Sequence, residues 1–265
     1  MARSLRPALL NPEPSGSDTR ALTGPPDCTV EGGSRMLASM PASELALSES
    51  DLDAVPIFPL PGVVLFPGAT LPLHVFEPRY RAMTRDVLAG RRLMAVALLE
   101  PGFEADYGER PPVHGVCGMG RVIREVQYPD GRFDIVLEGI ERICIVEELP
   151  PDQPYRVVRA RRLCDQTSDV AVAAAWQRQL AALLGDLESC LPYLATDLRD
   201  LTRFTEDAGA YSDRVAAAII AEPDEQQRLL QELDPAERLR ALVERLHELL
   251  DALSAGKGRP ASELN

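Results

Sequence analysis

The chain has 265 residues, of which 45% are hydrophobic, so it can bury the core of one or two soluble domains. Acidic residues outnumber basic ones, 41 to 28, and this balance opposes general binding to nucleic acid or to anionic lipid, because phosphate affinity depends on clustered Lys and Arg. The only lysine, Lys257, lies in a glycine-rich tail, which excludes a P-loop lysine, a Ser–Lys dyad and a Schiff-base lysine.

The first part of the chain is rich in Pro, Ser, Gly, Asp and Glu and shows no sustained hydrophobic periodicity, so we expect residues 1–54 to form a disordered extension. Only a short apolar run separates Arg6 from Pro12, which does not make a secretory signal, and no segment reaches the ~18 apolar residues of a membrane helix. We therefore expect a cytoplasmic protein. Translation from Met36 or Met40, both close to the folded part, is a hypothesis that the intact mass of the native protein would test.

Two short extended segments and a helix are predicted between residues 55 and 89. Prolines and glycines prevent residues 55–66 from forming a helix, and Pro67-Gly68 is a turn signal before a second extended segment at residues 70–75. Glu77-Pro78 begins a helix, since proline is tolerated at the first helical position, and this helix ends near Leu88.

Short strands are predicted from there to residue 163. Residues 93–99 are a nearly continuous apolar run, residues 113–127 give one or two strands broken at glycines, and Pro129-Asp130-Gly131 predicts a hairpin turn. Residues 133–138 alternate, with Phe, Ile and Leu on one face and Asp134, Val136 and Glu138 on the other. Six or seven short strands with one inserted helix suggest a small closed or nearly closed barrel.

After residue 164 the hydrophobic period becomes that of amphipathic helices. We expect five helices, with starts at Ser168-Asp169, Thr196, Ser212, Pro223 and Asp234-Pro235, where capping residues or an N-terminal proline stand. The second of them is expected to end at Gly209. This region is also the acidic one, since residues 164–265 carry 19 acidic and 10 basic residues.

PLPGVVLFPG, followed by LPLHVFEPRYRAM, resembles the start of the Lon N-terminal (substrate-binding) domain in the form found in small standalone proteins. The resemblance continues through Gly120 to Val122, the turn at Pro129, LEGIERICI and the helical end of the chain, and covers roughly residues 55 to 253. It implies a PUA-like pseudo-barrel and a role in polypeptide recognition linked to protein degradation or quality control. The ATPase and peptidase parts of Lon are expected to be absent.

The predicted fold is therefore α+β, a small PUA-like β pseudo-barrel with one inserted helix, followed by a C-terminal α-helical bundle. The expected organisation is an extension at residues 1–54, the barrel at 55–164, the helical subdomain at 165–254 and a flexible tail at 255–265.

A surface that receives an extended peptide is predicted where prolines, aliphatic side chains and charges gather around the first strands, the inserted helix and residues 138–142. Its candidate residues are Pro61, Val64, Phe66, Pro67, Glu77, Tyr80, Arg81, Glu138 and Arg142. The competing interpretation is that the charged residues form an ion-pair and capping network that holds the helix on the barrel. Unfolded or exposed polypeptide segments, and a protease or chaperone, are the expected partners.

No enzyme, metal or cofactor site is expected. His74, His114 and His247 lack a nearby nucleophile or a second ligand at short spacing, and no nucleophile–base–orienter set is visible. The five cysteines are widely spaced without a CxxC pair, which indicates buried thiols in a reducing compartment. RNA binding is the alternative function, because PUA-like barrels often bind RNA and a basic cluster stands on the last strand. The cluster is Arg156, Arg159, Arg161 and Arg162.

Overall fold

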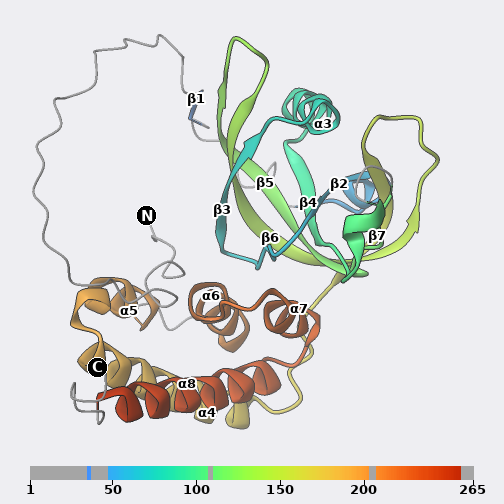
Figure 1. Ribbon diagram of the computed structural model, residues 1–265. Helices are drawn as coiled ribbons and strands as arrows, with labels where there is room; N and C mark the ends of the chain where they lie inside the picture. Colours follow the sequence, from blue (N-terminus) through green and yellow to red (C-terminus); the bar gives the residue numbers. More distant parts are fainter. Residues whose placement is uncertain (1–34, 37–46, 107–109, 203–206, 258–265) are drawn as a thin grey trace, which may run out of the picture.

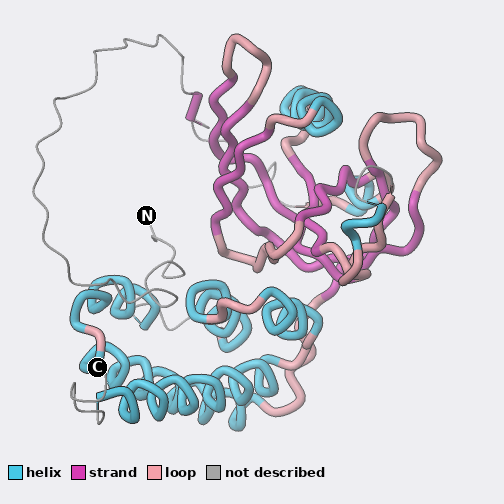
Figure 2. The backbone as a smooth tube through the Cα atoms, in the orientation of Figure 1, coloured by secondary structure: helices cyan, strands magenta, loops and turns pink. Residues whose placement is uncertain are grey.

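The computed structural model describes residues 35–36, 47–106, 110–202 and 207–257, and it shows a β-barrel set beside a layered group of helices (Figure 1). Figure 2 shows that the strands occupy one part of the molecule and most of the helices the other. The strands are β1 (Arg35–Met36), β2 (Val55–Leu60), β3 (Thr70–Val75), β4 (Leu93–Leu98), β5 (Val116–Gln127), β6 (Phe133–Glu148) and β7 (Arg156–Leu163). The helices are α3 (Pro78–Ala89), α4 (Val170–Cys190), α5 (Ala195–Thr202), α6 (Ala208–Ile219), α7 (Pro223–Gln231) and α8 (Pro235–Lys257). Short 3₁₀ turns are η1 (Glu49–Leu52), η2 (Phe103–Asp106) and η3 (Pro192–Leu194).

Hydrogen bonding closes the barrel. The strands follow the order β5-β4-β2-β7-β6, and β6 pairs back onto β5 to complete the ring. The β2–β4 pair is parallel and the remaining pairs are antiparallel, while β3 adds to β6 and β1 adds to β5 outside the ring. The prediction of an α+β barrel with one inserted helix, followed by helices, is confirmed.

The strands and the inserted helix begin and end where local sequence directs them. Pro78 is the first residue of α3, which ends at Ala89, and Gly131 adopts φ +83° in the hairpin turn between β5 and β6. Phe133, Ile135 and Leu137 are buried in alternation along β6, as the period-2 pattern predicts.

Strand β5 differs from the prediction because it runs unbroken through Gly118 and Gly120, with a register shift between Met119 and Gly120. The reason lies in the loop formed by residues 61–69. A Cβ on Gly118 would stand 1.9 Å from the Leu65 carbonyl oxygen, so glycine is required there for close backbone approach and not to end a strand.

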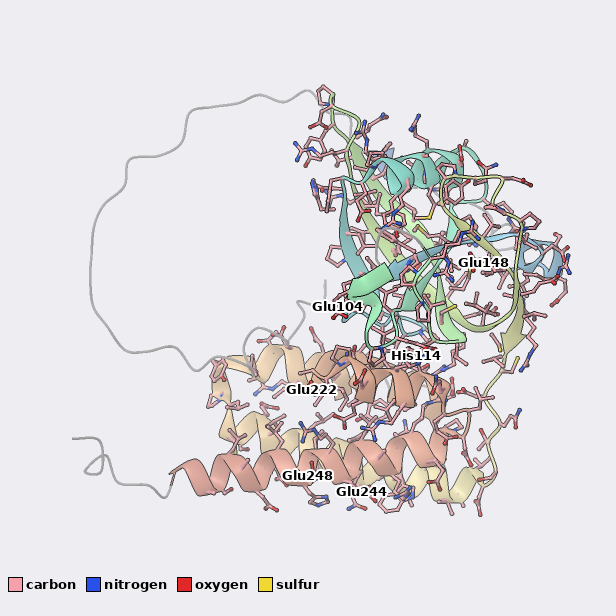
Figure 3. The ribbon with its side chains drawn as sticks, turned by 45° about the vertical axis from the view of Figure 1, so that its right-hand side comes forward. Glu104, His114, Glu148, Glu222, Glu244 and Glu248 are labelled. Carbon is pink, nitrogen blue, oxygen red and sulfur yellow. The ribbon has the colours of Figure 1, made fainter. Side chains whose placement is uncertain are left out.

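The helices form two layers beside the barrel (Figures 1 and 3). α6 and α7 lie between the barrel and an outer layer made by α4 and α8, and α5 lies beside α6 at the side away from α7. Asp169 caps α4 by accepting hydrogen bonds from the backbone N–H groups of Ala171 and Val172, and Asp234 accepts one from Ala236 at the start of α8. Glu244 and Glu248 lie on the side of α8 that faces away from the barrel (Figure 3).

The predicted cap of the third helix is wrong. Asp207 caps α6 and accepts from the N–H groups of Gly209 and Ala210, so Gly209 lies inside this helix and does not end the preceding one. Ser212 is buried in α6, where its hydroxyl donates to the Gly209 carbonyl at 2.7 Å.

The barrel core includes residues before position 55; the rest of the predicted extension, residues 1–34 and 37–46, lies outside the described residues. Leu47 and Leu52 are buried against Val55, Ile57 and other apolar residues of the barrel strands. These two leucines are part of the barrel core, although their surroundings in the sequence are polar. No helix within the described residues is long and apolar enough to cross a membrane.

Candidate polypeptide-binding surface

Four of the nine predicted surface residues are buried. Val64 is 8% exposed, Phe66 0%, Tyr80 5% and Arg142 4%. These side chains cannot touch a ligand in this conformation. Pro61 and Glu138 are exposed, and Pro67, Glu77 and Arg81 are half-buried.

Val64 and Phe66 belong to the junction between the barrel and the helices. Both side chains pack in the apolar core of the helical layers, whereas Leu65 between them packs in the barrel core. Backbone hydrogen bonds hold the end of this loop to β6, since Gly68 N–H donates to the Gly139 carbonyl and Gly139 N–H to the Ala69 carbonyl, both at 2.8 Å. The loop at residues 61–69, which carries part of the family resemblance, therefore joins the barrel to the helices.

Arg142 is the charged member of the same junction. From β6 it makes a two-point hydrogen-bonded ion pair with Asp213 of α6, with Nη1 2.7 Å from Oδ2, and its Nε donates to the Leu230 carbonyl at 3.0 Å. Arg238 of α8 lies on the other side of Asp213 and pairs with Asp165 at 2.7 Å. Burial raises the pKa of Asp213 above its ordinary value, and the hydrogen bond and charge of Arg142 oppose that rise. Arg142 therefore takes part in an ion-pair network, but its hydrogen-bonded partners lie in the C-terminal helices and not in the inserted helix of the predicted network. This network ties the barrel to the helical layers.

Residues of α3 serve two further contacts. Arg79 donates to Glu77 at 3.0 Å and stacks over the Tyr80 ring at 4.6 Å from its centroid. Arg81 donates to the carbonyl oxygens of Asp130 and Gly131, both at 2.8 Å, so it fixes the β5–β6 hairpin to the helix.

The exposed candidate for ligand binding is a groove of about 430 Å³ on the outward face of β3, β6 and β5. We call it the outer-sheet groove. It is lined by Pro72, Leu73, His74, Arg124, Val126, Asp134, Ile135 and Val136. Predicted Glu138 follows Val136 and Asp134 on the same face of β6, so it continues the line of the groove.

His74 and Asp134 line the outer-sheet groove, and Tyr128 is hydrogen-bonded to Asp134. Asp134 accepts hydrogen bonds from the Tyr128 hydroxyl and from His74 Nδ1, the latter at 2.6 Å. These two bonds lower the pKa of the Asp134 carboxyl, the Tyr128 bond having the larger effect, and the same bond raises the pKa of Tyr128. Phe76, 59% exposed, stacks on the His74 ring at 6.2 Å.

This groove is not among the sites predicted from the sequence, although the sequence contains one signal for it. Val136 stands on the otherwise polar face of an alternating strand, and a valine there is typical of a partly exposed apolar patch. Tyr128 carried no signal, because its partner Asp134 is reached only across the hairpin.

The basic cluster on β7 is largely neutralised. Arg156 pairs with Glu148 through two hydrogen bonds of 2.9 Å, and Arg159 pairs with Glu147. Arg162 pairs with Glu141 at 2.6 Å. Pairing with carboxylates of the neighbouring strand leaves little charge for phosphate groups.

The thiols are less buried than predicted. Cys117 alone among the described cysteines is buried, and burial raises the pKa of its thiol to about 12. Cys144 and Cys190 are half-buried and Cys164 is exposed; Cys28 lies outside the described residues. Within the residues that the structure describes, no group of His, Cys, Asp and Glu could hold a metal ion.

Comparison with known families explains this arrangement. The family described as "ATP-dependent protease La (LON) substrate-binding domain" matches residues 54–248. The chain belongs to this family. The matched region takes in the barrel, the junction and nearly all of the helices, and it confirms the resemblance found in the sequence.

Individual Lon proteases and the structure of a Lon N-terminal domain are also similar to this chain. The chain is 26% identical over 206 residues to Lon protease of Desulfosudis oleivorans and 27% identical over 207 residues to that of Roseiflexus castenholzii. In both cases the match covers 77% of this chain and 25% of the relative, so the chain spans about a quarter of the length of these proteases. The N-terminal domain of a Mycobacterium avium complex Lon protease is similar in structure, with a TM-score of 0.58 at 18% identity over 74% of this chain and 99% of that domain, which shows a shared fold.

Proposed function

We propose that this protein is a non-catalytic polypeptide-recognition module that binds unfolded or exposed apolar segments and acts in protein quality control or degradation in the cytoplasm. The observation that carries the proposal is the family match to a Lon substrate-binding domain over residues 54–248. A protease or a chaperone is the expected partner, because the matching family is the substrate-binding domain of an ATP-dependent protease.

The outer-sheet groove is the surface that fits this role. Pro72, Val126 and Val136 give it an apolar floor, and Arg124 and Asp134 provide charges at its sides. Exposed apolar side chains with polar groups around them are typical of surfaces that receive polypeptide. Of the residues predicted from sequence, Glu138 belongs to this face, and Pro61 and Pro67 are the accessible members of the loop before β3.

A binding measurement with one client in two states tests the proposal. The full chain is titrated into a fluorescently labelled protein that is either native or reduced and carboxymethylated, so that it stays unfolded. We expect binding to the unfolded state to be about tenfold tighter or more, which corresponds to about 1.4 kcal/mol. Equal affinity for both states, or no binding to either, would contradict it.

A pull-down from native lysate at low and moderate salt identifies the partner. Recovery of a protease or chaperone that survives moderate salt supports the proposed role. Recovery mainly of RNA that moderate salt removes would instead favour the nucleic-acid alternative, since phosphate contacts weaken steeply with salt.

A further inference from the structure

The outer sheet has two edges, and they differ. On one side β3 carries Pro72 in its middle, and a proline lacks the N–H group that an incoming strand needs. On the other side β5 has no proline between Val116 and Gln127. Strand β4 pairs with β5 only as far as Arg121, and Arg92 bonds to both backbone groups of Val122, so β4 does not cover the β5 edge beyond Val122.

A segment of this chain already pairs with that edge. Arg35 lies opposite Glu125 and Met36 opposite Arg124, in an antiparallel register. This contact joins a two-residue strand to a position about 90 residues further along the sequence, and Figure 1 shows β1 beside the β5–β6 hairpin. The β5 edge is thus able to accept an additional strand.

The backbone geometry identifies which groups face outward. Tyr128 N–H donates to the Arg132 carbonyl across the hairpin at 2.9 Å, so its backbone faces β6. Backbone direction alternates along a strand, and therefore the N–H and carbonyl groups of Glu125 and Gln127 face away from β6. Among the described residues β1 lies opposite Glu125 but not opposite Gln127.

A docked strand would also reach the outer-sheet groove. Side chains directly opposite each other on neighbouring strands lie about 4.5–5.5 Å apart at Cβ. Arg124 and Val126 both line the groove, so alternate side chains of a strand on this edge would lie beside it. Val126 favours an apolar side chain at the opposite position.

We propose that the β5 edge from Arg124 to Gln127 is a docking site for an extended, proline-free polypeptide segment with an apolar side chain beside Val126, and that Arg35–Met36 occupies part of this edge in the unbound chain. The inference rests on the proposed function, which it makes specific. A client strand would replace β1 and add main-chain hydrogen bonds to the sheet. Loss of the internal strand should therefore strengthen client binding.

The test uses the full chain and a labelled synthetic peptide with the sequence of residues 31–38. In the chain, Arg35→Pro removes the N–H that faces Glu125, and we expect it to tighten peptide binding about fivefold, because a competing internal ligand reduces apparent affinity. Adding Gln127→Pro, which removes an outward N–H of the edge, should abolish that binding. Gln127→Ala keeps the amide and should leave the binding of the Arg35→Pro chain unchanged.

A second peptide has valine at the position before its arginine, which would lie opposite Val126 if the peptide docks in the register of Arg35 and Met36, and it should bind more tightly than the first. Equal peptide binding by the unsubstituted chain and by Arg35→Pro, or no effect of Gln127→Pro, would overturn the inference. The unfolded client is measured in parallel. A client that binds the Gln127→Pro chain as tightly as the unsubstituted chain overturns the edge inference while the proposed function stands, whereas a client that binds neither chain removes the proposed function itself.

Discussion

The junction between barrel and helices and the outer face of β3, β6 and β5 contain similar residue types in opposite environments. At the junction Phe66 and Arg142 are buried, and the guanidinium is matched by a carboxylate. On the outer sheet Val136 and Arg124 remain accessible beside a groove. Apolar and charged residues near one another in a sequence therefore do not by themselves indicate a binding surface, because a junction between two layers needs the same residue types.

The junction should be the part most sensitive to substitution. Arg142→Met leaves the buried Asp213 carboxylate without its two-point partner, and we expect a loss of about 3–5 kcal/mol in the free energy of unfolding, measured with urea. Arg159→Met removes an exposed ion pair on the neighbouring strand and should cost about 0.5 kcal/mol or less.

A second variant separates pairing from packing. Arg142→Met combined with Asp213→Leu removes both charges and should recover part of the lost stability, since an apolar pair can replace a buried ion pair. If Arg142→Met is no more destabilising than Arg159→Met, the junction does not depend on this pair.

The next largest loss of stability is expected where two backbone segments approach closely at the junction. A Cβ on Gly139 would stand 2.1 Å from the Phe66 carbonyl oxygen, so Gly139→Ala should destabilise the protein by about 3 kcal/mol, measured by the same unfolding experiment. Gly185→Ala is the control: it meets nothing within 4 Å in α4 and should stabilise the protein by about 0.5–1 kcal/mol. Equal effects of the two substitutions on the free energy of unfolding would contradict the close backbone contact between Gly139 and Phe66.

The smallest expected effect is a change in the pKa of Asp134 in the outer-sheet groove. Because the Tyr128 hydroxyl is the main cause of the lowered pKa of Asp134, Tyr128→Phe should raise the pKa of that carboxyl toward its usual value. The carboxyl is followed by NMR titration between pH 2 and 6. Tyr193→Phe, which changes an exposed tyrosine in η3, should leave it unchanged.

The same carboxyl gives a pH dependence with a defined sign. Its pKa is lower in the folded state, so its ionised form stabilises the fold above the unfolded value of 3.8, and this stabilisation is lost as pH falls through the folded pKa. Asp134→Asn should therefore lower the melting temperature at pH 7 and have a smaller effect at pH 3. An equal change at both pH values would show that the Tyr128 and His74 bonds do not stabilise the ionised carboxyl.

Local chemistry made much of the fold predictable. Pro78 at a helix start, Gly131 in a turn and the alternation at residues 133–138 each depend on a few neighbouring residues, and the structure bears them out. Burial at the junction is harder to predict, because it depends on residues far apart in the sequence. Arg142 and Asp213 are 71 positions apart, and nothing near either of them indicates the other.

The candidate site was less predictable for the same reason. From the sequence, Val64 and Phe66 could form an exposed apolar surface or a buried core. They are buried because the helices pack over them, which the local sequence does not indicate. The pairing of Arg35–Met36 with β5 has no sequence signal, since two residues in a polar extension show no periodicity.

The most direct test of the account compares two valines of β6. Val136 lines the outer-sheet groove, whereas Val146 is 57% exposed outside it. The dissociation constant for the unfolded client is measured with Val136→Lys and with Val146→Lys in the full chain, together with their melting temperatures. We predict binding about tenfold weaker for Val136→Lys and unchanged for Val146→Lys, with both proteins folded. Equal binding by the two variants would contradict the assignment of polypeptide recognition to the outer sheet.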